Sequence, residues 1–159
     1  MNIDIIAVGK IKEKYLTAGI KEYLKRISPY CKLNIVEVRE EKAPETLSEK
    51  GKLQVLQREG KNILQRLHPT SFAIPLCIEG KQLSSEEMSI KISELTVSGN
   101  SHFTFIIGGS LGLSDEVKER GDLLLSFSKL TFPHQLMRLV LLEQIYRWFK
   151  IMRKEVYHK

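Results

Sequence analysis

The sequence predicts an α/β fold in which a mostly parallel sheet carries helices on both faces. Apolar runs of strand length alternate with amphipathic stretches of helix length along the 159 residues, which is typical of βα units. Several runs are apolar on both faces, as strands are when helices cover both faces of a sheet. The length suits one domain and no linker-like segment interrupts it, so we expect a single domain over residues 1–159.

The first half of the chain predicts two strands and two helices. A short apolar run is followed by apolar residues at helical spacing, and a second strand alternates apolar and β-branched residues with polar ones. A charged loop containing Pro44 comes next, and Pro69 stops the long amphipathic helix after it. The predicted ranges are strand 2–8, helix 13–27, strand 32–38, loop 40–45 and helix 46–67.

The second half continues the alternation. Residues 72–78 are apolar, and Glu79-Gly80 is expected to turn the chain. Ser84 or Ser85 precedes two glutamates, which predicts the start of a helix that runs to about residue 97. The remaining predicted elements are strand 103–107, a short acidic helix from Asp115 capped by Ser114, strand 123–127, and a last helix with Pro133 in its first turn, ending near Arg153.

The last predicted helix is apolar around most of its circumference. A chain of this size offers little core to bury such a helix, so we expect part of it to form a subunit interface, most simply in a two-fold homodimer. The alternative is a central core helix of a single chain. Its apolar positions are Leu136, Met137, Leu139, Val140, Leu141, Leu142, Ile145, Tyr146, Trp148, Phe149, Ile151 and Met152.

The net charge of +6 is concentrated at the two ends of the chain. Residues 1–67 carry 14 basic and 9 acidic side chains, residues 68–127 carry 4 and 8, and residues 128–159 carry 7 and 2. Basic ends suit a polyanionic partner such as nucleic acid, although a solubilising surface charge fits equally well.

Other features indicate a cytoplasmic protein. No apolar run is long enough to span a membrane, and no signal peptide precedes the first strand. Cys31 and Cys77 lack the spacing of a disulfide framework or a zinc site, which predicts reduced core thiols and no metal. His68, His102, His134 and His158 are too scattered to suggest a metal centre, and structural roles are expected for the first two.

One candidate ligand site remains after the common catalytic signatures are excluded. The chain has no phosphate-binding loop, zinc-protease motif, nucleophile elbow or dinucleotide fingerprint. Glycines and apolar residues instead follow three strands, at 76–80, 108–113 and 127–133. Glycines there let a ligand approach the backbone, and apolar walls suit adenine and a methionine-like tail better than a triphosphate. Tight turns that bind nothing are the alternative reading.

The C-terminal residues form a second candidate site. Spacings of three and four predict that Arg147, Lys150 and Lys154 share one helix face. Tyr157 can stack on a base, and His158 titrates near neutral pH. We therefore expect RNA binding here, with a frayed basic tail as the alternative. The candidate RNA-binding residues are Arg147, Lys150, Arg153, Lys154 and Lys159.

A resemblance to a known family rests on five segments that span the chain. They are 5–10 (IIAVGK), 105–113 (FIIGGSLGL), 126–138 (SFSKLTFPHQLMR), 142–147 (LEQIYR) and 157–159 (YHK). Together they resemble the ribosomal RNA large subunit methyltransferase H family of the SPOUT superfamily. The resemblance implies S-adenosylmethionine-dependent methylation at N3 of a pseudouridine in 23S rRNA, in the decoding-centre stem-loop (helix 69) of the assembled ribosome. It also implies a C-terminal trefoil knot, a homodimer, and neither DNA nor membrane as a partner.

The resemblance also assigns roles to residues. The family's tail usually reads Pro-Tyr-His-Arg/Lys, and Val156 stands here in place of the proline. Arg138 and Lys159 are candidates to hold RNA phosphate or stabilise the deprotonated base, and His158 is the candidate base. The catalytic candidates are His158, Arg138 and Tyr157; the expected cofactor contacts are Leu76, Gly108, Phe127, Ser128, Lys129, Leu130, Thr131 and Phe132.

Two other classes of function stay open at this point. A ribosome-binding factor without catalysis would share the basic ends, and a small-molecule nucleotide binder would share the crevice at the strand ends.

Overall fold

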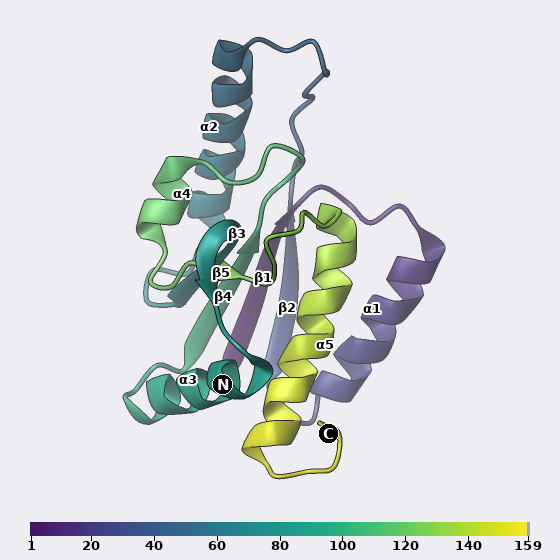
Figure 1. The fold of residues 1–159 in the computed structure, drawn as a ribbon, viewed down its shortest axis with the longest axis vertical. Coiled ribbons are helices and arrows are strands. Elements are labelled where there is room, and N and C mark those ends of the chain that lie inside the picture. Colours follow the sequence, from purple (N-terminus) through teal and green to yellow (C-terminus); the bar gives the residue numbers. More distant parts are fainter. Residues whose placement is uncertain (159) are drawn as a thin grey trace.

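Five parallel strands form one sheet in the order β2-β1-β4-β3-β5 (Figure 1). The computed structural model describes residues 1–158, and it confirms the α/β class. The strands are β1 (Asn2–Val8), β2 (Lys32–Val38), β3 (Phe72–Gln82), β4 (His102–Ile107) and β5 (Leu125–Ser126). The helices are α1 (Lys14–Ile27), α2 (Glu49–Arg66), α3 (Ser85–Val97), α4 (Asp115–Arg120) and α5 (His134–Met152).

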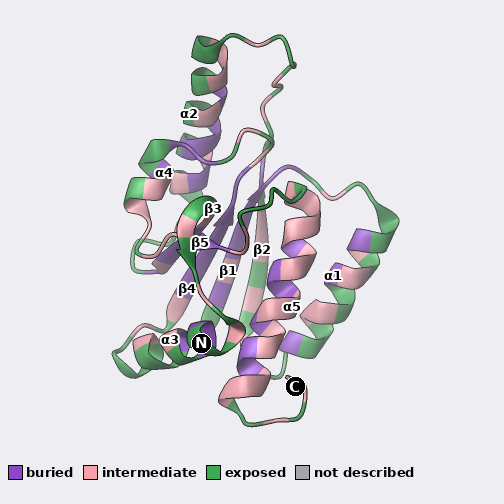
Figure 2. Cartoon of the chain, in the orientation of Figure 1, coloured by how far each residue is buried: buried purple, intermediate pink, exposed green. Residues whose placement is uncertain are grey.

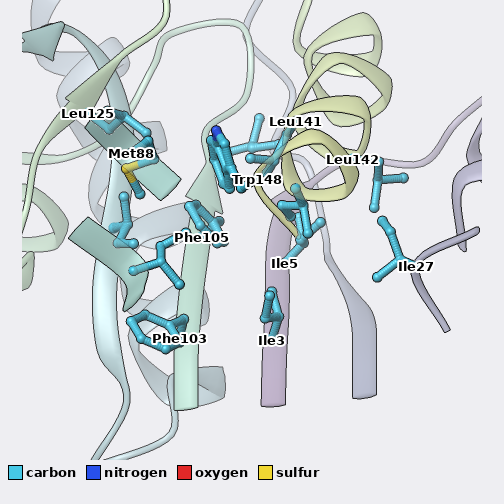
Figure 3. Close-up of a cluster of buried hydrophobic side chains, with 14 of the residues drawn as sticks. Ile3, Ile5, Ile27, Met88, Phe103, Phe105, Leu125, Leu141, Leu142 and Trp148 are labelled. Atoms are coloured by element: carbon cyan, nitrogen blue, oxygen red, sulfur yellow. The ribbon is translucent and has the colours of Figure 1, made fainter. Parts of the chain in front are cut away.

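The helices cover both faces of the sheet, as the fully apolar strands predict. On one face α1, α3 and α5 bury the larger apolar cluster, in which Phe105 of β4 lies beside Trp148 of α5, and Phe103 lies level with Ile3 of β1 (Figure 3). On the other face α2 and α4 bury a smaller cluster around Ile6. Alternate residues of β1 and β4 point to opposite clusters, so these central strands are buried on both sides.

Two strands differ from the prediction. β3 does not turn at Gly80 but continues to Gln82, with a register shift between Leu76 and Lys81 where it pairs with β5. β5 spans two residues instead of 123–127. It lies at the edge of the sheet and pairs only with β3. Leu123 lies before β5, and its backbone N–H donates to the carbonyl of Ala73 without forming part of a strand pair. The hydrogen-bonding requirement of this N–H is therefore met although the residue is not in a strand.

The helix ends follow local capping chemistry. Ser84 and Glu87 form a capping box at the start of α3, and the Ser114 side chain accepts the N–H of Val117 at α4. α2 begins at Glu49 rather than at 46, because the Ser48 side chain caps it. Pro133 is the N-cap of α5 and lies just before its first turn.

α5 packs against the sheet with α1 and α3 beside it (Figure 2). Six of its 19 residues are buried and the other thirteen are half-buried. Leu142, Ile145 and Trp148 are at most 2% exposed. The half-buried apolar residues are Leu136, Met137, Leu139, Val140, Tyr146, Ile151 and Met152. α1 and α3 thus cover much of the helix within the single chain, and an interface on the apolar surface that remains stays a prediction.

The two cysteines are free thiols, as predicted, but both are only half-buried. Cys31 lies just before β2, and Cys77 lies in the part of β3 that shifts register. Burial raises the pKa of the Cys31 thiol to about 11. The structure therefore supports unreactive thiols outside the core rather than core thiols.

Candidate functional site

A cleft of about 690 Å³ lies beside β3, β4 and β5 at the carboxyl edge of the sheet. Three segments line it, around Leu76, around the loop 108–113 after β4, and around the segment 126–134 between β5 and α5. The sequence predicted a site from these same three segments, and the structure brings them together. The volume is in the range of small-molecule and cofactor sites, about 300–1,000 Å³.

Seven of the eight expected cofactor contacts line the cleft. The exception is Lys129, which is exposed and lies outside the lining. The Ser128 side chain accepts the N–H of Leu130, and the Ser126 hydroxyl donates to the carbonyl of Ser128. These bonds form a turn with Lys129 on its outside. The seven lining residues are Leu76, Gly108, Phe127, Ser128, Leu130, Thr131 and Phe132.

The glycines after β4 form a tight turn that the loop itself requires. The N–H of Gly112 donates to the carbonyl of Gly109, and Gly112 has a φ of 83°. A Cβ on Gly108 would lie 2.4 Å from the carbonyl oxygen of Gly112. The turn itself therefore requires a glycine at position 108, because a side chain there would collide with the backbone of Gly112; its role as a cofactor contact stays a prediction.

The cleft walls are mainly apolar, and the charges in them are largely compensated. Lys118 and Glu79 form an ion pair in the lining, and their hydrogen bond lowers the pKa of Glu79 and raises that of Lys118. His134 also lines the cleft. Its Nε2 is buried, has no hydrogen-bond partner within residues 1–158, and lies 3.9 Å from a carboxylate oxygen of Glu40. Such a site suits a ligand with little net charge.

Sequence reasoning missed several lining residues. Ile78, Ser110 and Leu111 lie within the three predicted segments, whereas the lining residues Lys118 and Met137 lie outside them. His134 could have been found, because it stands inside the 126–138 segment that carried the family resemblance.

Arg138 is buried, which contradicts its expected place at the RNA. Its side chain is 1% exposed, and its guanidinium donates to Glu37 of β2 at 2.8 Å and to the carbonyls of Val8 and Gly9. All three acceptors lie at the carboxyl ends of β1 and β2. Arg138 therefore fastens the first turns of α5 to the sheet, and its guanidinium is not available to phosphate in this structure.

The last described residues fold back onto the chain. The Tyr157 hydroxyl donates to Glu143 at 3.1 Å, and the guanidinium of Arg147 lies 4.8 Å from the centre of the Tyr157 ring. Burial, followed by the hydroxyl of Tyr23 and the nearby Glu143, raises the Tyr157 pKa. His158 lies 2.6 Å from Glu86 at the start of α3 and 3.2 Å from Arg147. The tail is thus docked across α5 and α3.

The basic face expected near the C-terminus is largely neutralised. Arg147 pairs with Glu143, and Lys150 pairs with Glu155. Arg153 lies over the ring of Tyr30. Lys154 is not on the predicted helix face, because α5 ends at Met152 and Lys154 has a φ of 55°. Lys159 lies outside the described residues.

The cleft lies at the start of α5, and the tail folds back from the end of this helix to its middle. His134 and Met137 of α5 line the cleft, whereas Tyr157 contacts Glu143, and His158 contacts Glu86 of α3. At 1.5 Å per residue, Met137 and Glu143 are about 9 Å apart along the helix. In the docked position Tyr157 and His158 therefore lie outside the lining of the cleft.

Two classes of site are not found in the described part of the chain. Among residues 1–158 no group of three or more His, Cys, Asp or Glu side chains is arranged to hold a metal ion. No helix among the same residues has the length and apolarity that a membrane crossing requires.

Comparisons with known proteins identify relatives that match along the whole chain. A family model described as "Predicted SPOUT methyltransferase" matches residues 1–158. Proteins named "Ribosomal RNA large subunit methyltransferase H" from Carboxydothermus hydrogenoformans, Clostridioides difficile and Enterococcus faecalis are 60%, 59% and 57% identical over 159 residues. Each comparison covers 100% of this chain and 100% of the relative.

A solved structure shares the fold at low identity. It is described as "a probable methylase family protein" from Haemophilus influenzae, and it superposes with a TM-score of 0.55 at 11% identity. The match covers 99% of this chain and 70% of that chain. At this identity the likeness concerns the fold alone.

Proposed function

The chain belongs to the SPOUT methyltransferase family, and on that premise we propose that it methylates ribosomal RNA with S-adenosylmethionine as the donor. The full-length relatives named as large-subunit rRNA methyltransferases support the substrate class. The observation that carries the proposal is the cleft, because it joins three distant segments into one site of cofactor size. The finer assignment is N3 of a pseudouridine in the helix 69 stem-loop of 23S rRNA, in the assembled ribosome.

The residues present fit this cofactor. Adenine needs a flat apolar slot with main-chain hydrogen bonds at its edge, and the walls at Leu76, Phe127 and Leu130 with the adjoining backbone can provide both. The amino-acid end is a zwitterion, which the hydroxyl groups of Ser128 and Thr131 can accommodate without an opposite net charge. The ion pair of Glu79 and Lys118 leaves the rest of the lining nearly neutral.

When bound, S-adenosylmethionine supplies a methyl group on a positively charged sulfur. The residues of this chain have two tasks in the proposed reaction. The cleft must hold the donor with its methyl group facing the acceptor nitrogen, since orientation supplies much of the acceleration in a displacement. A nearby group must take the imide proton of the acceptor base, and His158 is the proposed group. In the docked tail both imidazole nitrogens face other side chains, so His158 has to leave Glu86 and Arg147 before it can act.

The position of the tail supports a homodimer. Tyr157 and His158 are docked on Glu143 and Glu86, outside the lining of the cleft of their own chain. Their proposed catalytic role is at the cleft of a second copy, into which the tail extends. In the proposed enzyme each cleft is completed by the tail of the partner chain, and rRNA in the cytoplasm is the substrate. A C-terminal trefoil knot, as the family resemblance implies, belongs to the same proposal.

Methyl transfer from labelled S-adenosylmethionine to ribosomes, isolated subunits and naked rRNA tests the activity and its substrate form. We expect transfer to assembled ribosomes, with the label at N3 of a pseudouridine in helix 69. Donor binding by calorimetry separates an enzyme from a ribosome-binding factor, because a non-catalytic factor would bind no donor. Turnover on free nucleotides without RNA would instead favour a small-molecule enzyme.

Deletion of residues 157–159 tests the role of the tail. Turnover on ribosomes should be lost while donor affinity changes little, because neither Tyr157 nor His158 lines the cleft. A mixture of this variant with one altered in the cleft should recover activity if tail and cleft come from different chains. Unchanged turnover of the deletion variant would remove the tail from the mechanism.

A further inference from the structure

The loop between β1 and α1 and the outer face of α1 carry most of the excess positive charge of the chain. Residues 10–26 hold six basic and two acidic side chains, which is +4 of the total +6. One of the two acids, Glu22, is already paired with Arg26. Five exposed lysines remain, and within residues 1–158 none of them forms a salt bridge with a carboxylate: Lys10, Lys12, Lys14, Lys21 and Lys25.

The local structure places these lysines on one continuous surface. In the loop Lys10 and Lys12 are exposed, whereas Ile11 between them packs against the main core cluster. In α1 the positions 14, 18, 21 and 25 repeat at helical spacing on the face opposite the buried Leu16 and Ile20. Along this face Lys14 and Lys21 are separated by about 10 Å, and Lys21 and Lys25 by about 6 Å. The outer side of α1 is exposed along its length (Figure 2).

This surface adjoins the end of the molecule that holds the cleft. The loop passes beside the start of α5 (Figure 1), where the N–H of Lys12 donates to the side chain of Gln135 at 3.1 Å. The next residue toward the cleft, His134, belongs to its lining. The loop is therefore held in place beside the cleft, and its lysines follow from there onto α1.

An exposed aromatic ring lies between the lysines and α5. Tyr15 is 68% exposed although it is a large and largely apolar side chain. A Cβ on Gly19 would lie 3.0 Å from Leu139 of α5, so this side of α1 faces α5. Tyr15 is one helical turn before Gly19 and shares that side. Lysines that attract a phosphate backbone beside a ring that can stack on a base are the two elements of single-stranded nucleic-acid binding.

We propose that the segment Lys10–Tyr15 and the lysine face of α1 form an RNA-binding surface that leads the substrate strand into the cleft. The inference rests on the proposed function, since it assigns the RNA contacts of the same enzyme to a surface other than the C-terminal tail. The two basic surfaces differ in how many of their charges are paired with carboxylates, and this difference favours the lysine surface as the RNA contact. Arg147 and Lys150, the basic residues of α5 near the tail, are paired with glutamates, whereas the five lysines here are unpaired within residues 1–158.

Neutralisation of the loop lysines tests the proposal. The variant K10Q/K12Q/K14Q is compared with K50Q/R58Q/K61Q, which removes the same charge from exposed positions on α2, on the opposite face of the sheet. Affinity for a mixed-sequence single-stranded oligoribonucleotide is measured between 50 and 200 mM salt. Each phosphate contact contributes about 0.7 to the slope of log affinity against log salt, so the loop variant should lose about 2 from that slope. The α2 variant should keep the wild-type slope.

Tyr15 provides an independent measurement. Y15A should weaken binding of the same oligoribonucleotide by about 5- to 150-fold, the range for loss of one base–aromatic stack, whereas Y15F should bind like the wild type. Equal salt slopes for the loop and α2 variants, or unchanged binding by Y15A, would overturn the proposal. The proposal would also be overturned if the K10Q/K12Q/K14Q variant lost binding to vesicles of acidic lipid but kept the wild-type affinity for RNA. If the wild-type protein methylates no RNA, the proposed function fails, but the salt slopes still decide whether this surface binds RNA.

Discussion

Replacement of Arg138 should destabilise the fold rather than remove a substrate contact. The guanidinium is 1% exposed and donates to one carboxylate and two carbonyls. In R138M the apolar stem is kept and these three donors are lost. The carbonyls of Val8 and Gly9 then lose a hydrogen-bond partner in the interior, at about 1–3 kcal/mol each. Glu37 is 39% exposed, so water can replace its partner at little cost.

These contributions predict a loss of about 2–6 kcal/mol, which comes from the two carbonyls. A domain of this size is stable by about 5–15 kcal/mol, so R138M should remain mostly folded at room temperature but close to its limit. The corresponding fall in Tm is about 4–24 °C. E37Q is the comparison variant: its amide oxygen can still accept from the guanidinium, but the buried positive charge loses its counter-charge, so E37Q should also lose stability while the two carbonyl contacts remain.

Urea unfolding followed by tryptophan fluorescence measures this directly. The chain has a single tryptophan, Trp148, which is 2% exposed in the main core cluster and reports loss of that core. R138M and E37Q should both unfold at lower urea than the wild type, R138M because two interior carbonyls lose their donor and E37Q because the buried guanidinium loses its counter-charge. If R138M unfolds at the wild-type midpoint but no longer transfers methyl groups, Arg138 acts on the substrate and the structural argument is refuted.

Three further predictions concern a glycine, a buried carboxylate and a cysteine. G108A should disrupt the loop after β4 and abolish donor binding, because its Cβ would collide with the backbone of Gly112. G112A adds no clash but strains a φ of 83°, so it should weaken donor binding less than G108A; calorimetry of both variants decides. In the folded protein, burial raises the pKa of the Glu59 carboxyl above its ordinary 4.5. Folding therefore favours the protonated group, whose contribution to stability is complete below pH 4.5 and is lost as the pH rises through the folded-state pKa. E59Q should therefore flatten the dependence of the urea midpoint between pH 4.5 and 7.5, and an unchanged slope would contradict this. Cys31, with its pKa raised to about 11, should react with iodoacetamide at pH 8 more slowly than a free cysteine; an equal rate in the folded protein would show that it is not shielded.

The sequence predicted those strands, helix starts and cleft segments that depend on short-range residue patterns. Fully apolar runs located β1 and β4 to within one residue, and serines followed by acidic residues located the starts of α3 and α4. The three segments of the cleft were predicted because glycines and apolar residues follow strands that end at one edge of a parallel sheet. Each of these inferences depends on residues close together in the chain.

Long-range partners decided the features that the sequence did not predict. Arg138 has its carboxylate partner 101 residues away at Glu37, and no local pattern distinguishes such a residue from one that binds phosphate. Likewise much of the apolar circumference of α5 is covered by α1, which precedes it by more than a hundred residues. The end of α5 was misjudged for a third reason. Lys154 adopts a left-handed conformation, which is uncommon for a residue with a side chain and which spacing does not reveal.

The central place of α5 also determines when the protein can fold during its synthesis. The main core cluster needs Leu141, Leu142, Ile145, Trp148 and Phe149, which come from the last twenty residues of the chain. Until they are available, the face of β1 and β4 that belongs to the main core cluster lacks much of its cover, and α1 lacks the helix against which it packs. Contacts between such distant residues form slowly, and a partly made chain with exposed strands is prone to aggregate. We therefore expect folding to be completed only after translation ends, and fragments that lack α5 to be insoluble.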